Sequence, residues 1–212
     1  MRQAIQQNVL STSPGNNNTQ LLHEQIVVAS NMATKTKTAV KKKAANKTAK
    51  KTPFKNYATH LNPGDTAPSF TGIDQNGSTV SLRDYKGKKL VLYFYPEDNT
   101  PTCTKQACNL RDNYSLLQQK GIEIIGVSED TVAKHKKFET KFNLPFRMIA
   151  DEKHEIINAY DVWGKKIFMG IIYDGIIRTT FLINENGVID HVINRPKTGH
   201  HSMEILECWK LG

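Results

Sequence analysis

The chain of 212 residues carries 29 lysines and arginines against 20 acidic residues, a formal net charge of +9, and only three cysteines. So few cysteines, in an odd number, exclude the disulfide framework of a small secreted protein and favour a reducing, cytoplasmic setting. The apolar run at 26–29 is too short for a signal peptide, and no stretch approaches the about 20 apolar residues of a membrane-spanning helix. We therefore expect no membrane partner.

The positive charge is concentrated in residues 1–52. Nine of the 29 basic residues but only one of the 20 acidic ones, Glu24, lie there, so this segment carries +8 and the remainder +1. Its low-complexity Lys/Ala/Thr stretch has few large apolar side chains to bury, which predicts a disordered, Lys-rich extension over 1–52 and a folded domain over 53–212. The extension either solubilises the protein or binds nucleic acid non-specifically by counterion release, with association to a nucleoid or nucleus.

Turn signals at 62–64 and 76–77 open the folded part. Apolar runs and helical periodicity then predict strands at 90–95, 122–127, 146–150, 179–183 and 188–193, and helices at 101–120, 132–142, 152–160 and 201–210. The last two strands flank Asn-Glu-Asn-Gly at 184–187, which is typical of a hairpin turn. This order predicts an α/β domain with a mixed central sheet flanked by helices.

Cys103 falls at the start of a predicted helix. Thr100 suits the N-cap, Pro101 suits the first helical position, and Gly121 suits the C-terminal end. Unpaired N–H groups in the first helical turn stabilise a thiolate, and such placements lower a cysteine pKa from about 8.5 to about 3.5–7.5. A thiol in this position is an activated nucleophile, whereas a lone cysteine would more simply be a small buried apolar residue.

Cys108 lies five residues further on and about 140° around the helix, away from the apolar stripe that includes Cys103, Ala107 and Leu110. Packing does not explain it, so we interpret Cys108 as a second reactive thiol. The two cysteines lack a second tight pair of ligands, and we expect no metal or other cofactor. Cys208 is most simply a residue of the closing helix.

Pro96, Thr100 and Cys103 form the pattern P-x-x-x-T-x-x-C, which resembles the active-site motif of the peroxiredoxins. The Cys103-x4-Cys108 spacing resembles the bacterioferritin-comigratory, or Q-type, subgroup. The resemblance covers about residues 61–210 and includes the segments PGDTAPSF at 63–70, GVSED at 126–130, RTTFLI at 178–183 and KTGHHSMEIL at 197–206.

This resemblance implies a thioredoxin-like fold, a monomer, and a thiol peroxidase that reduces hydrogen peroxide and alkyl hydroperoxides. It implies that Cys103 becomes a sulfenic acid, that Cys108 resolves it as a disulfide, and that thioredoxin is the reductant. In the family, the residue matching Pro96 shields the thiolate, the hydroxyl matching Thr100 hydrogen-bonds thiolate and peroxide, and the arginine matching Arg178 pairs with the thiolate. An arginine suits that role because it stays charged and presents several fixed donors.

Two positions depart from the family pattern: Thr102 replaces the glycine usual before the catalytic cysteine, and Asn184 stands where the family often has aspartate. The branched Thr102 side chain leaves the accepted peroxide size open, while Asn184 belongs to a hairpin away from the chemistry. His200 and His201 are expected in a loop at a helix start. Trp163 is expected to be structural or to flank the active-site pocket.

Two rival functions differ in class. A disulfide oxidoreductase normally requires Cys-x-x-Cys, which this chain lacks. A redox sensor or nucleic-acid-associated protein that uses the basic extension is the non-catalytic alternative. If Cys103 and Cys108 form a disulfide, the helix must open, because Cα atoms five positions apart on a helix are roughly 8.6 Å apart. Disulfides rarely span more than about 7 Å between Cα atoms.

Overall fold

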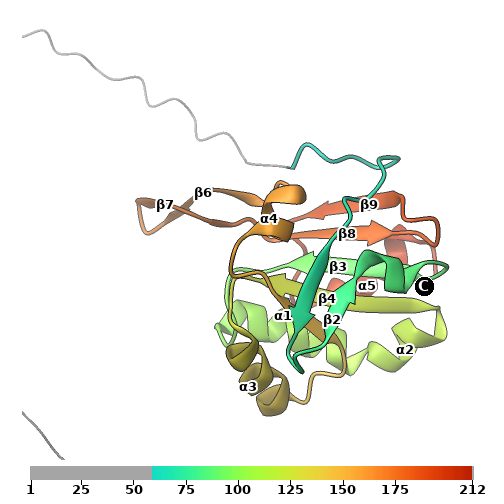
Figure 1. The fold of residues 1–212 in the computed structure, drawn as a ribbon, viewed down its shortest axis with the longest axis horizontal. Coiled ribbons are helices and arrows are strands. Elements are labelled where there is room, and N and C mark those ends of the chain that lie inside the picture. Colours follow the sequence, from blue (N-terminus) through green and yellow to red (C-terminus); the bar gives the residue numbers. More distant parts are fainter. Residues whose placement is uncertain (1–58, 212) are drawn as a thin grey trace, which may run out of the picture. The chain divides into compact units, whose positions relative to one another are not determined.

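The computed structural model describes residues 59–211, so the predicted extension, the boundary at 52/53 and any contact with nucleic acid lie outside the described residues. A seven-stranded sheet forms the centre of the fold in the order β2-β1-β5-β4-β3-β8-β9 (Figure 1). Its strands are β1 (Thr71–Asp74), β2 (Thr79–Ser81), β3 (Lys89–Phe94), β4 (Ile122–Ser128), β5 (Arg147–Ala150), β8 (Thr179–Ile183) and β9 (Ile189–Asn194). The β3–β4 and β4–β5 pairs are parallel and the other pairs antiparallel, which confirms the predicted mixed sheet.

Among residues 59–211, five α-helices and one short 3-10 helix surround the sheet. They are η1 (Leu82–Tyr85), α1 (Pro101–Asp112), α2 (Tyr114–Gln119), α3 (Val132–Phe142), α4 (Glu155–Ala159) and α5 (His201–Cys208). Side chains from α1, α2, α3 and α5 share one apolar cluster with the sheet, and side chains from α4 share the other. Residues 90, 92 and 94 of β3 belong to one cluster, and residues 91, 93 and 95, of which the last directly follows the strand, to the other. Burial on both faces explains why this strand is apolar at nearly every position.

The predicted helix at 101–120 is wrong in one respect, because it is interrupted at Asn113. The Asn113 backbone has φ −110° and ψ 12°, and its side-chain amide donates to the carbonyl of Asn109 at 2.9 Å. Such local bonds compete with the helical ladder. The chain therefore forms α1 and α2 as separate helices.

The helix predicted at 152–160 begins later, at Glu155. The Asp151 carboxylate accepts the N–H groups of Glu155 at 2.9 Å and Ile157 at 2.7 Å, which satisfies donors that open the first turn. Residues before Glu155 belong to the turn that positions this carboxylate.

A second, two-stranded sheet was not predicted. Strands β6 (Trp163–Phe168) and β7 (Ile171–Ile176) form an antiparallel hairpin that projects from the rest of the domain (Figure 1). Its two turn residues, Met169 and Gly170, have φ of 49° and 81°, the left-handed conformation that tight hairpin turns require. Within the described part of the chain, no helix is long and apolar enough to cross a bilayer.

Candidate active site

Cys103 occupies the first turn of α1, as predicted. Thr100 is the N-cap residue with an extended backbone, Pro101 opens the helix, and the Thr104 N–H donates to the Thr100 carbonyl at 2.8 Å. The Thr100 hydroxyl differs from expectation, because it accepts no capping bond and donates instead to the Glu97 carbonyl at 3.2 Å. The residue types thus set the helix start through backbone conformation, and the hydroxyl lies in the loop before Cys103.

Arg178 meets Cys103 across 75 residues of sequence. Its Nη2 donates to Cys103 Sγ at 3.1 Å, and the cysteine is only 3% exposed. Arg178 directly precedes β8, whose pairing with β3 brings it to the end of the sheet where α1 begins. A guanidinium held against a buried sulfur stabilises negative charge on that sulfur, and it is the one cation in hydrogen-bond contact with it among residues 59–211.

A series of buried hydrogen bonds holds the Arg178 guanidinium in place. Its Nη1 donates to the Gln106 side-chain oxygen, and the Gln106 amide nitrogen then donates to His201 Nδ1 at 3.0 Å. With Nδ1 accepting, His201 Nε2 carries the proton and donates to the Thr180 hydroxyl at 3.1 Å. Burial, followed by the nearby Arg178 charge, lowers the pKa of His201 to about 3, so the ring is neutral.

Sequence reasoning missed Gln106, Thr180 and the buried, hydrogen-bonded side chain of His201. His201 is the first residue of α5 and is fully buried, whereas His200 is the exposed N-cap residue. Gln106 lies one turn after Cys103 and has no exposed surface, although it is polar. A polar residue at that spacing on the apolar face of α1 is the signal that could have identified it.

A small cleft opens beside Arg178. It has a volume of about 270 Å³ and is lined by Pro96, Lys165, Lys166, Ile167, Ile177, Arg178 and Arg195. Of these lining residues four are basic and none is acidic. Burial, followed by the Arg178 charge, lowers the pKa of Lys166, whose Nζ donates to the Ile176 carbonyl at 3.0 Å. Pro96 thus lines the same cleft as Arg178.

All three cysteines are free thiols. Cys108 is half-buried on α1, outside the buried core that contains Cys103. Cys208 packs against that core from α5, and burial raises the pKa of its thiol, followed by the charges of Glu204 and Glu207. A thiol with a raised pKa is a weaker nucleophile at neutral pH, which agrees with a structural role for Cys208.

Comparison with known proteins identifies the family. The AhpC/TSA family matches residues 63–192. Peroxiredoxin Bcp of Escherichia coli (strain K12) is 43% identical over 150 residues, which cover 71% of this chain and 96% of that protein. This chain is a peroxiredoxin. Peroxiredoxin Bcp of Bacillus subtilis (strain 168) is 44% identical over 147 residues, or 69% of this chain and 94% of that protein.

Solved structures agree with the Q-type resemblance of this peroxiredoxin. A mutant of Xylella fastidiosa PrxQ matches with a TM-score of 0.67 and 30% identity over 72% of this chain and 98% of that one. Xanthomonas campestris peroxiredoxin Q matches with a TM-score of 0.65 and 29% identity over 72% and 96%. The thioredoxin-like fold with a mixed sheet flanked by helices and the assignment to the thiol peroxidases are thereby confirmed.

The structure places the two residues that depart from the peroxiredoxin pattern, Thr102 and Asn184. Thr102 is exposed on the first turn of α1, beside the buried Cys103. Asn184 stabilises the β8–β9 turn, where its side-chain oxygen accepts the N–H groups of Asn186 at 3.0 Å and Val188 at 3.1 Å. Trp163 packs on the α4 side of the sheet, with its ring 4.3 Å from that of His154, and is structural rather than a residue of the cleft.

One group of side chains has the composition of a metal site. The ligand atoms of Asp98, Asp130 and His135 lie within 4.8 Å of one another and all three residues are buried. Hydrogen bonds already engage them: Asp130 Oδ2 accepts the Asp98 N–H and the Ser128 hydroxyl, each at 2.8 Å. We therefore assign this group to the support of the loop before Cys103 and assign no metal to it.

Proposed function

We propose that Cys103 is the thiol with which this peroxiredoxin attacks hydrogen peroxide and organic hydroperoxides. The observation that carries the proposal is the 3.1 Å contact between Arg178 Nη2 and Cys103 Sγ at a helix start. The sulfur attacks one peroxide oxygen, so an S–O bond forms while the O–O bond breaks, and the other oxygen leaves as water or an alcohol. Cys103 is oxidised to a sulfenic acid and the peroxide is reduced.

Arg178 supports this step through charge. Negative charge moves from sulfur to the leaving oxygen as the O–O bond breaks, and a fixed guanidinium can stabilise both ends. Gln106 and His201 restrain Arg178, so its orientation costs little reorganisation during the reaction. We propose that the Thr100 hydroxyl, now bonded to Glu97, turns to the bound peroxide.

The cleft beside Arg178 is consistent with small alkyl substrates, because Pro96, Ile167 and Ile177 provide apolar surface. Alkyl peroxide reduction is the activity named for the bacterioferritin comigratory protein of Xanthomonas campestris, whose structure matches with a TM-score of 0.64 and 28% identity. We extend that substrate class to this chain.

We further propose that Cys108 resolves the sulfenic acid. Its thiol attacks Cys103 sulfur, the sulfenic oxygen leaves as water, and a Cys103–Cys108 disulfide forms. A dithiol reductant, which we propose is thioredoxin, then exchanges with this disulfide and is itself oxidised. The proposal includes a monomeric enzyme in the cytoplasm, where thiols are kept reduced.

Peroxide consumption coupled to thioredoxin tests these assignments. Cys103→Ser should abolish turnover, and Cys108→Ser should give one rapid turnover and a trapped sulfenic acid. Cys208→Ser is the matched control and should cycle like the wild type. Retained turnover in Cys103→Ser would end the proposal, and normal cycling of Cys108→Ser would transfer resolution to another thiol. Consumption of only one peroxide per wild-type chain would favour the redox-sensor alternative.

A further inference from the structure

The loop between β3 and α1, residues 95–100, contains both Pro96 and Thr100 and ends where α1 begins. At its centre, the Asp98 N–H donates to Asp130 Oδ2 at 2.8 Å. The Asp98 side chain is only 5% exposed, and that of its partner His135 on α3 is fully buried. A buried carboxylate requires compensation for its lost hydration, so its hydrogen-bond partners reveal its role.

Asp98 has partners on two sides. Its Oδ1 accepts the Tyr95 hydroxyl at 2.7 Å, and its Oδ2 lies 2.7 Å from His135 Nδ1. On the opposite side of the ring, His135 Nε2 lies 3.2 Å from the Ile149 carbonyl. A carbonyl only accepts, so Nε2 carries a proton, and a second proton must lie between Nδ1 and Oδ2. The pair is therefore joined by a short hydrogen bond whether that proton resides on nitrogen or on oxygen.

Neighbouring groups reinforce this connection from the same helix. Lys134 Nζ donates to Asp130 Oδ1 at 3.0 Å and so compensates the second carboxylate of the cluster. Lys141 Nζ donates to the Asn99 side-chain oxygen at 2.7 Å, and Asn99 has a φ of 61°. An L-residue in the left-handed region requires support from its surroundings. Helix α3 and the turn before it thus hold two consecutive loop residues, Asp98 and Asn99.

We propose that Asp98, through its buried bond to His135, is a positioning residue that sets the geometry of the peroxide-binding loop. It touches neither Cys103 nor the cleft, but the loop that it fixes carries Pro96 and Thr100 and defines the first turn of α1. This inference rests on the proposed role of Cys103. Loss of one partner leaves the other buried and uncompensated, so the loop should rearrange rather than remain in place.

Two substitutions of Asp98 separate the effect of its negative charge from the effect of its hydrogen bonds on the loop. Asp98→Asn keeps an acceptor for Tyr95 and offers an amide donor to His135 Nδ1, whereas Asp98→Ala removes both bonds. We expect Asp98→Ala to slow peroxide attack on Cys103 by at least about tenfold, since displacements of the order of 1 Å cost up to about 100-fold. Asp98→Asn should remain within about threefold of the wild type. Stopped-flow oxidation of the reduced protein measures these rates.

A second readout distinguishes positioning from general destabilisation. Iodoacetamide reacts with any accessible thiolate and requires no ordered loop, so its rate on Cys103 should change much less than the peroxide rate in Asp98→Ala. Gln75→Ala is the control: buried Gln75 donates to the Phe146 carbonyl at 3.0 Å and accepts the Met148 N–H at 2.8 Å, away from the loop. It should lower the thermal midpoint and leave the ratio of the two rates unchanged.

Three outcomes would overturn the inference. Folded Asp98→Ala could react with peroxide at the wild-type rate, or it could lose peroxide and iodoacetamide reactivity equally. Gln75→Ala could also change the ratio of the two rates as much as Asp98→Ala does. If Asp98→Ala does not fold, His135→Asn and His135→Ala are compared instead. The asparagine amide can still donate to Asp98, so His135→Asn should retain a peroxide rate that His135→Ala loses. Inactivity of Cys103→Ser establishes the proposed function independently, so the two hypotheses can fail separately.

Discussion

Arg178 divides its two terminal nitrogens between Cys103 Sγ and Gln106, and this division determines what a substitution removes. Arg178→Ala deletes the cation at the sulfur and should slow peroxide attack by about 100- to 1000-fold, the usual cost of one charge-stabilising donor. Arg178→Lys keeps the charge but has a single nitrogen, so we expect an intermediate rate. Stopped-flow oxidation measures both, with circular dichroism as the test of folding.

Arg147→Ala is a suitable control for charge alone. Arg147 pairs with Asp74 at 3.5 Å, its side chain is 49% exposed, and it lies at the start of β5, outside the cleft and the Cys103 contacts. It should oxidise at the wild-type rate. An equal loss of rate in Arg147→Ala and Arg178→Ala would mean that net charge, not the contact with sulfur, controls reactivity.

His201 makes the stability of the domain depend on pH. Its folded-state pKa is about 3, below the ordinary 6.5, so between these values the unfolded chain binds a proton that the folded chain does not. The free energy of unfolding should therefore fall as pH decreases below 6.5, by about 2 kcal/mol between pH 6.5 and 5. Urea unfolding at the two pH values measures this loss, and His201→Gln should show a smaller one. An identical loss in the variant would contradict the assignment.

Two residues of α1, Gln106 and Asn109, bond to α5 and the residues just before it, and the proposed disulfide affects them differently. Gln106, which bonds His201, lies between the two cysteines, whereas Asn109 lies beyond them. The Asn109 side chain donates to the Gly199 carbonyl at 3.2 Å and accepts the Ser202 N–H at 2.9 Å. Oxidation should therefore open the segment up to Cys108 and leave the Asn109 connection in place.

Hydrogen exchange tests this expectation on reduced and oxidised protein. Amides at 104–108 should lose protection on oxidation, because a helical Cα separation of roughly 8.6 Å must shorten to about 7 Å or less. Helix α2 begins after the break at Asn113 and should exchange equally in both states. Unchanged protection at 104–108, with a Cys103–Cys108 bond confirmed by mass spectrometry, would refute the opening of α1.

The elements that could be predicted are those whose sequence pattern lies within the element or directly beside it. Strand β3 was predicted from its apolar run and α3 from helical periodicity over 132–142, and the structure adds a Thr131 side chain that caps α3 and an Asn143 that ends it in the left-handed conformation. The placement of Cys103 followed equally from Thr100 and Pro101. The Gln106–His201 bond joins residues 95 positions apart, and no local spacing encodes such a contact. The Asp98–His135 bond escaped prediction for the same reason.

At the scale of the whole molecule, the charge separates into two segments. Residues 1–52 carry +8 of the net +9, so any affinity for nucleic acid should reside there. A chain that starts at Pro53 should lose salt-sensitive DNA binding and keep full peroxidase activity. Fluorescence anisotropy across a salt series, beside the coupled peroxidase assay, measures both. Equal DNA affinity of the two chains would contradict this assignment.

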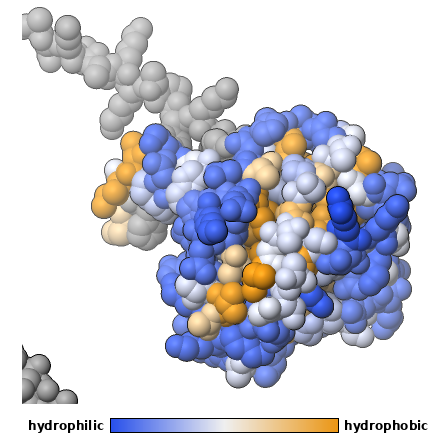
Figure 2. All heavy atoms as spheres, viewed as in Figure 1, coloured by the Kyte–Doolittle hydropathy of each residue, from blue (hydrophilic) through white to orange (hydrophobic). Residues whose placement is uncertain are grey.

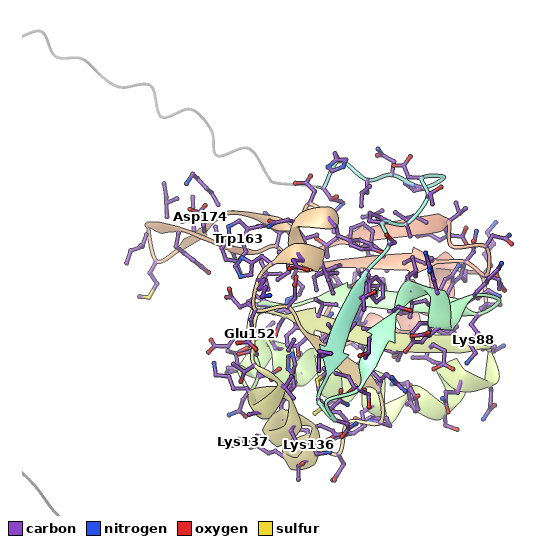
Figure 3. The ribbon with its side chains drawn as sticks, viewed as in Figure 1. Lys88, Lys136, Lys137, Glu152, Trp163 and Asp174 are labelled. Carbon is purple, nitrogen blue, oxygen red and sulfur yellow. The ribbon has the colours of Figure 1, made fainter. Side chains whose placement is uncertain are left out.

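The β6–β7 hairpin carries apolar side chains that neither apolar cluster buries. Ile167 is 50% exposed, Met169 86%, Ile171 68% and Ile172 57%, and Figure 2 shows this apolar surface at the end of the hairpin. Trp163 lies at the base of the hairpin and Asp174 farther along it (Figure 3). The hairpin is thus attached to the domain through its base, while its outer part contributes little to the core.

This arrangement bears on how the enzyme can diverge. Ile167 lines the cleft beside Arg178 and yet is half-exposed, so a substitution there should reshape the cleft at a stability cost within about 0.5 kcal/mol. Residues around Cys103 lack this freedom because they are buried in the central core. If peroxides reach Cys103 through this cleft, as proposed, substitutions in the hairpin should change the preferred peroxide while Cys103 and its hydrogen-bonded neighbours stay in place.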